Sequence, residues 1–135
     1  MADNFMDELA AYFQTNSVGT VGLNTNTGWG VYVIHQPGTI DKVVVITPFA
    51  SVSDPDIPTT NRNFQVMVVA PSTKEALDKA KGVHDLLARK IAVQLTTIYV
   101  FGFSVSSMPN YAGQDERERA RIVADYTAFA RGSHV

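Results

Sequence analysis

The clearest pattern of apolar and polar positions lies in the middle of the chain, where two different repeats follow one another. Residues 63–70 alternate with a period of two, which indicates a β-strand. The alternation is half-polar at first and then apolar on both sides, so we expect the strand to run from a rim into a covered sheet. Pro71 lacks a backbone donor and restricts Ala70 to extended geometry, which predicts the end of the strand there. The alternating sets are Asn63, Gln65, Met67 and Val69 on one face and Phe64, Val66, Val68 and Ala70 on the other.

A helix is predicted directly after this strand. Ser72 and Glu75 have the spacing of a capping box, in which the serine hydroxyl accepts from the Glu75 N–H and the Glu75 carboxylate reaches back. We therefore expect the helix to begin at about Thr73. Its apolar positions recur every three or four residues, which predicts one face packed on the sheet and a charged face opposite. These apolar positions are Ala76, Ala80, Val83, Leu87 and Ile91.

The start of the chain predicts another helix and then an irregular stretch. Asp3 or Asn4 can cap this helix, which should end near Asn16. Its apolar stripe consists of Phe5, Leu9, Tyr12 and Phe13. Residues 17–30 contain four glycines and several turn-forming residues, so they are too interrupted to form one regular element.

Two strands are predicted next, over residues 31–35 and 42–47. Residues 36–39 read Gln-Pro-Gly-Thr, which predicts that the chain turns directly from one strand into the other. Residues 43–46 are continuously β-branched, as expected for a strand covered on both faces. Residues 49–61 contain two prolines and almost no periodicity. A linker of this length inside a domain is usually functional or mobile.

The last third of the chain predicts one clear strand and one ambiguous segment. In the strand at residues 98–106 we expect Tyr99, Phe101, Phe103 and Val105 to form the core face, with smaller residues opposite. Residues 108–113 read as a loop. In the final segment, Ile122, Tyr126 and Phe129 fit a helix, whereas Ile122, Ala124, Tyr126 and Ala128 fit a strand. The local pattern leaves both alternatives open.

Composition narrows the class of protein. The chain has 135 residues, enough for one domain with a substantial core, and no cysteine, which excludes disulfides and thiolate sites. The formal charge of −2 gives no general attraction to nucleic acid or to anionic membranes. No apolar run approaches the ~20 residues of a membrane span, and the acidic start lacks the basic region of a signal peptide. We expect a soluble, non-exported protein.

Candidate chemical motifs are weak. His35, His84 and His134 lack metal-ligand spacing, and neither glycine-rich stretch has the lysine or the glycine fingerprint of a phosphate loop. Asp54 and Asp56 could bind a cation, but no further ligands accompany them. The serines near residues 104–107 do not lie in a nucleophile elbow. We therefore expect no enzyme activity, no metal and no other cofactor.

The order of features resembles the tail terminator proteins of long-tailed bacteriophages, a family also described as minor capsid or head-tail joining proteins. The matching features are a short first helix, glycine-rich residues 19–24, the Pro37 turn, the strand at residues 43–46, and a proline-containing loop before Arg62. Then follow the strand at residues 64–69, the helix with Ala76, Ala80, Leu86 and Leu87, and a tail with Pro109, Asp115 and Arg119. One departure is Glu118, which stands where the family commonly has a glycine; another is the strand-like stretch at residues 29–32.

The resemblance implies an α+β fold for a single domain over residues 1–135. Its mixed or mostly antiparallel sheet is flanked by helices, in the order helix, three strands, helix, two strands. Residues 119–130 then form the last strand, in which alternation would put Arg117, Arg119 and Arg121 on one side and Glu116 and Glu118 on the other. Two surfaces of opposite sign would suit the two neighbours of a ring subunit. A solvated charged strand or helix start is the simpler alternative.

The resemblance also implies a function and partners. The family forms a hexameric ring at the head-proximal end of the tail tube, in a virion assembled in the host cytoplasm. The ring stops polymerisation of the major tail tube protein and presents a face to the head connector, while DNA passes through the lumen and no membrane is contacted. The expected subunit or tube interface consists of Arg117, Arg119, Arg121, Glu116, Glu118, Asp54, Asp56 and Arg62.

Two alternatives remain at this point. The first is another neck or tail-completion protein at a different level of the same axis. The second is a small ligand-binding or enzymatic α+β domain, with Tyr32, His35, Tyr99 and Tyr111 near a cleft.

Overall fold

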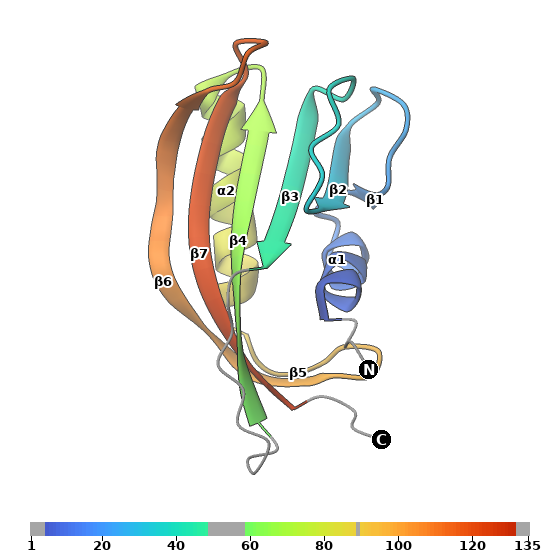
Figure 1. Ribbon diagram of the computed structural model, residues 1–135, viewed down its shortest axis with the longest axis vertical. Coiled ribbons are helices and arrows are strands. Elements are labelled where there is room, and N and C mark those ends of the chain that lie inside the picture. The colour runs from blue at the N-terminus through green and yellow to red at the C-terminus, as the bar shows by residue number, and fades with distance from the viewer. Residues whose placement is uncertain (1–4, 49–58, 89, 132–135) are drawn as a thin grey trace.

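The computed structural model describes residues 5–48, 59–88 and 90–131. It contains two helices and seven strands in these residues (Figure 1). In chain order they are α1 (Phe5–Thr15), β1 (Thr20–Val21), β2 (Trp29–Val33), β3 (Lys42–Pro48), β4 (Thr59–Ala70), α2 (Thr73–Ala88), β5 (Ile91–Gln94), β6 (Tyr99–Gln114) and β7 (Ala120–Arg131).

All seven strands belong to one curled sheet in the order β1-β2-β3-β4-β7-β6-β5. The pairs β1/β2 and β2/β3 are parallel and all other pairs are antiparallel, so the sheet is mixed. Helix α2 packs against β4, β7 and β6, and α1 packs against β1, β2 and β3 (Figure 1). The α+β class predicted from the sequence is confirmed, although the strand number and order differ in detail.

The centre of the sheet is the pair β4/β7, which stays in register from Thr59 opposite Arg131 to Ala70 opposite Ala120. Along β7 the even-numbered side chains are buried and the odd-numbered ones are half-buried or exposed. The predicted alternation of both strands is therefore confirmed, and β7 begins one residue later than expected. Phe64 and Tyr126 stack in the core with ring centroids 5.7 Å apart.

The cap of α2 has the predicted form. Ser72 Oγ accepts a hydrogen bond from the Glu75 backbone N–H at 3.2 Å and donates to Glu75 Oε1 at 3.2 Å. The helix begins at Thr73, as expected, and buries Ala76, Ala80, Val83 and Leu87. It ends at Ala88, so Ile91 does not extend its apolar face but opens β5, where the side chain is 76% exposed.

The connection between β2 and β3 is not the direct turn that the Pro37 segment predicts. The two strands are parallel, so residues 34–41 must return along the sheet before β3 begins. Ile34 leaves the strand with a φ of 69°, and the buried Ile40 packs with Val43, Val45 and Val69. This apolar contact pins the returning segment on the face of the sheet opposite the helices. Residues 43–46 are accordingly buried on both faces, as predicted.

Strand β6 also differs from the prediction. Phe103 is buried as predicted, whereas Phe101 and Val105 are exposed, so the expected aromatic core face is confirmed only in part. A register shift between Val100 and Gly102 inserts one extra residue, which reverses the side to which the following side chains point. The expected loop at residues 108–113 is part of β6, and Pro109 lies at another irregularity, between Ser107 and Asn110, where no ladder donor is needed.

The structure differs from the sequence prediction in three smaller ways. β1 and β5 are short strands that the sequence pattern did not indicate. Residues 59–61, expected at the end of an irregular linker, belong to β4. Residues 49–58 of that linker, and the expected cap at Asp3 or Asn4, lie outside the described residues.

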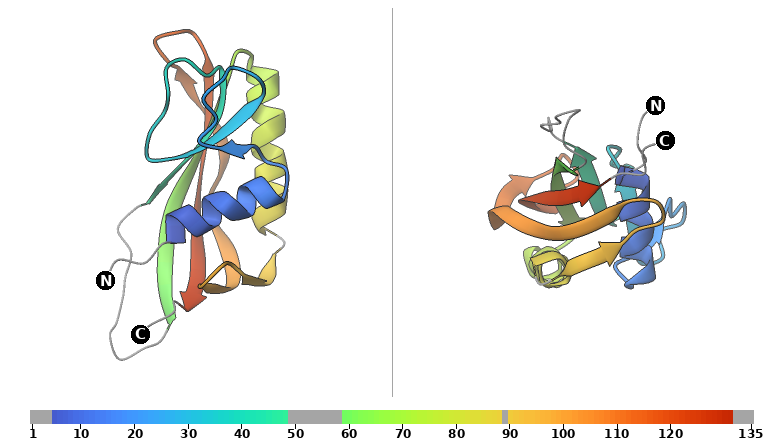
Figure 2. Two further views of the ribbon diagram at one scale, coloured as in Figure 1. Left: turned by 90° about the vertical axis from the view of Figure 1, so that its right-hand side faces the viewer. Right: turned by 90° about the horizontal axis from the view of Figure 1, so that it is seen from below.

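A buried carboxylate joins the two ends of the curled sheet. Glu8 of α1 is 8% exposed, and its Oε1 accepts from the backbone N–H groups of Thr97 at 2.7 Å and Ile98 at 3.1 Å. Its Oε2 accepts from the Thr97 hydroxyl. The turn between β5 and β6 thereby meets α1, which packs at the opposite side of the sheet (Figure 2). We refer to this contact as the Glu8 clasp.

The Glu8 clasp should contribute measurably to stability. Glu8→Ala leaves the buried Ile98 N–H without its acceptor, and we expect the free energy of unfolding to fall by about 2–3 kcal/mol. The control Asp7→Ala changes an exposed acid on the same helix and should stay within about 0.5 kcal/mol. Urea unfolding measures both variants. Equal effects of the two substitutions would contradict a specific role for Glu8.

Candidate functional site

The charged segment predicted as an interface forms the turn between β6 and β7. Asp115 and Arg119 close this turn: the Asp115 N–H donates to the Arg119 carbonyl at 2.9 Å, and the Glu118 N–H donates to the Asp115 carbonyl at 3.0 Å. Glu118 has a φ of 61°, in the left-handed region that favours glycine. The glycine that the resemblance leads us to expect at this position would adopt this backbone conformation without strain.

Asp115 is the acceptor at the centre of the turn. Its Oδ1 accepts from the backbone N–H groups of Arg117 at 3.0 Å and Arg119 at 2.9 Å, and its Oδ2 pairs with Arg119 Nε at 2.7 Å. The side chains of Asp115 and Arg119 are only 9% and 6% exposed. Burial raises the pKa of Asp115, but the two backbone hydrogen bonds and the Arg119 guanidinium together outweigh it and lower that pKa.

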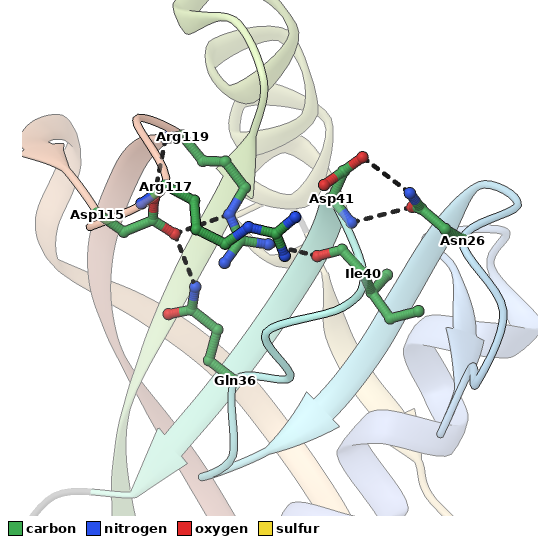
Figure 3. A network of polar contacts seen from close by, with 7 residues as sticks. All are labelled: Asn26, Gln36, Ile40, Asp41, Asp115, Arg117 and Arg119. Carbon is green, nitrogen blue, oxygen red and sulfur yellow. Dashed lines mark hydrogen bonds and ion pairs between the residues drawn. The ribbon is translucent and has the colours of Figure 1, made fainter.

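This pair connects the turn to the returning segment between β2 and β3 (Figure 3). Arg119 Nη1 donates to the Ile40 carbonyl, and Gln36 Nε2 donates to Asp115 Oδ2 at 3.2 Å. The next residue, Asp41, is held in turn by Asn26, whose Oδ1 accepts from the Asp41 N–H at 3.0 Å and whose Nδ2 donates to Asp41 Oδ2 at 2.8 Å. Three segments that are far apart in the sequence are thus fixed to one another.

The outward side of the turn carries charges of both signs. Glu116, Arg117 and Glu118 are exposed, and Arg121 is half-buried with Nη2 3.4 Å from the Ala112 carbonyl. A polar hollow lies beside them. It is lined by Gln36, Gly38, Gln114, Asp115, Glu116, Arg117, Arg119 and Arg121. Such a surface can form ion pairs and hydrogen bonds with another protein.

The predicted interface residues lie in different parts of the structure. The fold brings Glu116, Arg117, Glu118 and Arg121 together at the turn. Alternation begins only at Ala120, so the expected separation of arginines and glutamates onto two faces of a strand is wrong. Arg119 is 5% exposed and belongs to the interior network of the subunit.

The remaining predicted interface residues lie elsewhere. Arg62 is half-buried on β4 opposite Ala128, toward the other end of that strand. Asp54 and Asp56 lie outside the described residues. Gln36 and Ile40 were missed, because the Pro37 segment suggested a turn and gave no indication of a contact with residues distant in the sequence.

The other candidate residues do not converge on a reaction centre. Tyr32 is on β2 and donates to the Leu23 carbonyl, whereas Tyr99 is on β6 and packs edge-on against Phe101. The central strands β3, β4 and β7 lie between them, so the residues of the expected ligand cleft do not meet. His84 Nδ1 lies 3.0 Å from the Tyr126 hydroxyl. In residues 5–48, 59–88 and 90–131 we find no group of three potential metal ligands, and no helix long and apolar enough to cross a membrane.

Comparisons with known proteins agree with the resemblance seen in the sequence. A family model described as "Bacteriophage tail terminator protein" matches residues 12–130. Among solved structures, a chain of the "Virion of native gene transfer agent (GTA) particle" is similar in fold, with a TM-score of 0.60 and 17% sequence identity. The similarity covers 93% of this chain and 94% of that chain. No curated protein matches the sequence.

The turn predicts a stabilising substitution. Glu118→Gly relieves a left-handed conformation that costs roughly 1–2 kcal/mol, against an entropy cost for glycine of roughly 0.5–1 kcal/mol. We expect thermal or urea unfolding to show a gain of up to ~1 kcal/mol. Glu116→Gly is the matched control, because Glu116 is not at a positive φ, and it should be neutral or destabilising. A loss of stability in Glu118→Gly would contradict the assigned turn.

The Asp115 network predicts a pH dependence. Because the pKa of Asp115 is lowered in the folded protein, its stabilisation is complete above the ordinary value of about 3.9 and is lost as the pH falls through the lowered value. Asp115→Asn should lower the free energy of unfolding by about 1–3 kcal/mol at pH 7. The difference from the unsubstituted protein should shrink below pH ~4. Asp7→Asn is the control, and a difference that stays constant down to low pH would refute the role of the Asp115 charge.

Proposed function

The chain belongs to the bacteriophage tail terminator family, and on this basis we propose that it forms a ring that caps the head-proximal end of the tail tube. In this role it stops the addition of tube subunits and joins the tail to the head. Members of this family are structural proteins of the virion rather than enzymes. The observation that carries the proposal is the family match over residues 12–130. This range includes all seven strands apart from the last residue of β7, but only the end of α1.

The physical basis of termination is occlusion. A subunit that matches the exposed end of the tube on one face, but differs from it on the other, cannot template another ring of tube protein. Such a protein acts through its surfaces, and the clustered turn residues provide a surface of defined shape. The proposed ring symmetry is six-fold, as the family resemblance implies.

We assign the exposed residues of the β6–β7 turn to the contact with the major tail tube protein. Glu116, Arg117 and Arg121 line the polar hollow and Glu118 is exposed beside them, while the buried Asp115–Arg119 pair fixes the turn on the body of the subunit. Preorganisation of this kind reduces the entropy lost on binding. Asp54, Asp56 and Arg62 remain candidates for a second part of the same contact.

DNA would pass through the lumen of this ring on its way from the head. Its backbone carries one negative charge per ~1.7 Å, so a wall with few cations would let it slide. The net charge of −2 and the pI of about 5.8 agree with this requirement. On the head side, the partner would be the connector or neck protein.

A second candidate is another neck or tail-completion protein on the same axis. It is favoured by one observation: the related GTA structure is described as part of a virion, without a stated position in it. Gene order in the parent phage separates the two, because a terminator gene is expected next to the gene of the major tail tube protein.

Deletion of the gene tests the proposal directly. Heads and tubes should form in normal amounts, but the tubes should overgrow and fail to join heads, because nothing occludes the growing end. Electron microscopy of the lysate measures tail length and attachment. Tails of normal length on full heads would exclude the proposed function.

Complementation then tests the turn. Arg117→Glu should fold normally and fail to restore normal tail length, because it reverses an exposed charge of the proposed tube contact. Lys81→Glu reverses an exposed charge on α2 and is the matched control. Purified unsubstituted protein added to a tail extract should cap tubes without added metal or nucleotide. Equal complementation by both variants would remove the turn from the tube contact.

A further inference from the structure

The charges of this chain are distributed unevenly. Residues 9–40 and residues 91–114 contain no Asp, Glu, Lys or Arg. All 11 basic and all 13 acidic residues lie in the rest of the chain. Charged residues make up about a quarter of a typical domain, so two long stretches without any call for a structural explanation.

The fold places these two stretches at opposite edges of the sheet. Residues 9–40 include β1 and β2 at one edge, and residues 91–114 form β5 and β6 at the other edge. In Figure 1, β6 and the pair β1/β2 lie on the two lateral sides of the molecule, with β3, β4 and β7 between them. We refer to the two surfaces as the β6 flank (residues 103–113) and the β1–β2 flank (residues 20–35).

The β6 flank has an open strand edge. β5 pairs with β6 only as far as Gly102, and among the described residues no strand pairs with the outer edge beyond that point. Met108 and Tyr111 on this flank are 62% and 54% exposed. Proteins usually protect a free edge with charged side chains, especially lysine. The β6 flank carries no charged side chain, so this form of protection is missing there, although Pro109 and the register shifts of β6 interrupt the edge.

The β1–β2 flank has the same character. β1 is the outermost strand on its side of the sheet, and the exposed apolar side chains here are Val21 at 44% and Ile34 at 66%. The residues between β1 and β2 are small or neutral polar ones. An uncharged surface with a few exposed apolar side chains therefore occurs on both sides of the subunit.

We propose that these flanks are the two halves of the lateral contact in the ring, with the β1–β2 flank of one copy against the β6 flank of the next. The inference rests on the proposed ring function. A heterologous contact joins two different patches of one chain and closes a ring when the rotation permits. The central part of a protein interface is depleted of charged residues, as both flanks are. A second copy of this chain supplies the matching uncharged surface.

This arrangement also separates two kinds of contact. The lateral contact is apolar and uncharged, whereas the charged β6–β7 turn lies at one end of the sheet, between the flanks, where it can face a partner along the axis (Figure 1). In this arrangement the arginine and glutamate residues of the turn contact a partner along the axis and not the lateral neighbour.

The chain contains no cysteine, so a cysteine pair can report on this contact alone. We would introduce Ile34→Cys and Met108→Cys together, assemble the protein, and treat it with a bismaleimide cross-linker. Because each contact would then carry one cysteine from each flank, a denaturing gel should show a ladder of covalent species up to the full ring. Each single variant should give no ladder. The pair Val21→Cys with Tyr111→Cys repeats the test at neighbouring positions.

The control pair is Leu77→Cys with Met108→Cys, because Leu77 is 40% exposed on α2 and outside both flanks. A ladder from this control, or dimers from Met108→Cys alone, would overturn the heterologous pairing. If the unsubstituted protein forms rings and caps tubes but neither flank pair gives a ladder, the lateral assignment is wrong and the proposed function stands. A protein that neither forms rings nor caps tubes would instead refute the proposed function itself.

Discussion

The antiparallel pairing of β4 with β7 is the constraint on which the rest of the structure depends. It is continuous over twelve residues of each strand, and its alternation presents one face of apolar side chains to α2. β4 also carries β3 on its other side, and β7 carries β6. Every other element therefore takes its position from this pair, including the turn at the end of β6 and the two edges of the sheet.

Two buried carboxylates then hold distant segments to this centre. Glu8 joins α1 to the turn between β5 and β6, and Asp115 with Arg119 joins the β6–β7 turn to the segment between β2 and β3. Both acids accept hydrogen bonds from backbone N–H groups, which offset the cost of removing a charge from water. The result is a curled sheet whose edges and turn keep fixed relative positions, as an assembly subunit requires.

The distribution of charge agrees with the role of a virion structural protein. Charged side chains gather at the β6–β7 turn and on α2, whereas the two edges of the sheet carry only neutral residues. A subunit that contacts its own copies sideways and a different protein along the axis needs two chemically distinct kinds of surface. The family match agrees with a structural protein of the phage tail.

The sequence by itself determined the elements that depend on local periodicity and capping. These include both helices, the box of Ser72 and Glu75, the alternation of β4, and the coverage of residues 43–46 on both faces. It also placed the charged turn as the candidate site. The periodicity of the last segment fitted both helix and strand, and its residue propensities favoured the helix. Only the family resemblance favoured the strand that pairing with β4 then realises. The tertiary structure alone decided the parallel pairing of β2 with β3, the shift in β6 that exposes Phe101, and the burial of Arg119 against Asp115 and Ile40. The physical reason is the same in each case: the outcome depends on a partner distant in the sequence, which no local pattern can identify.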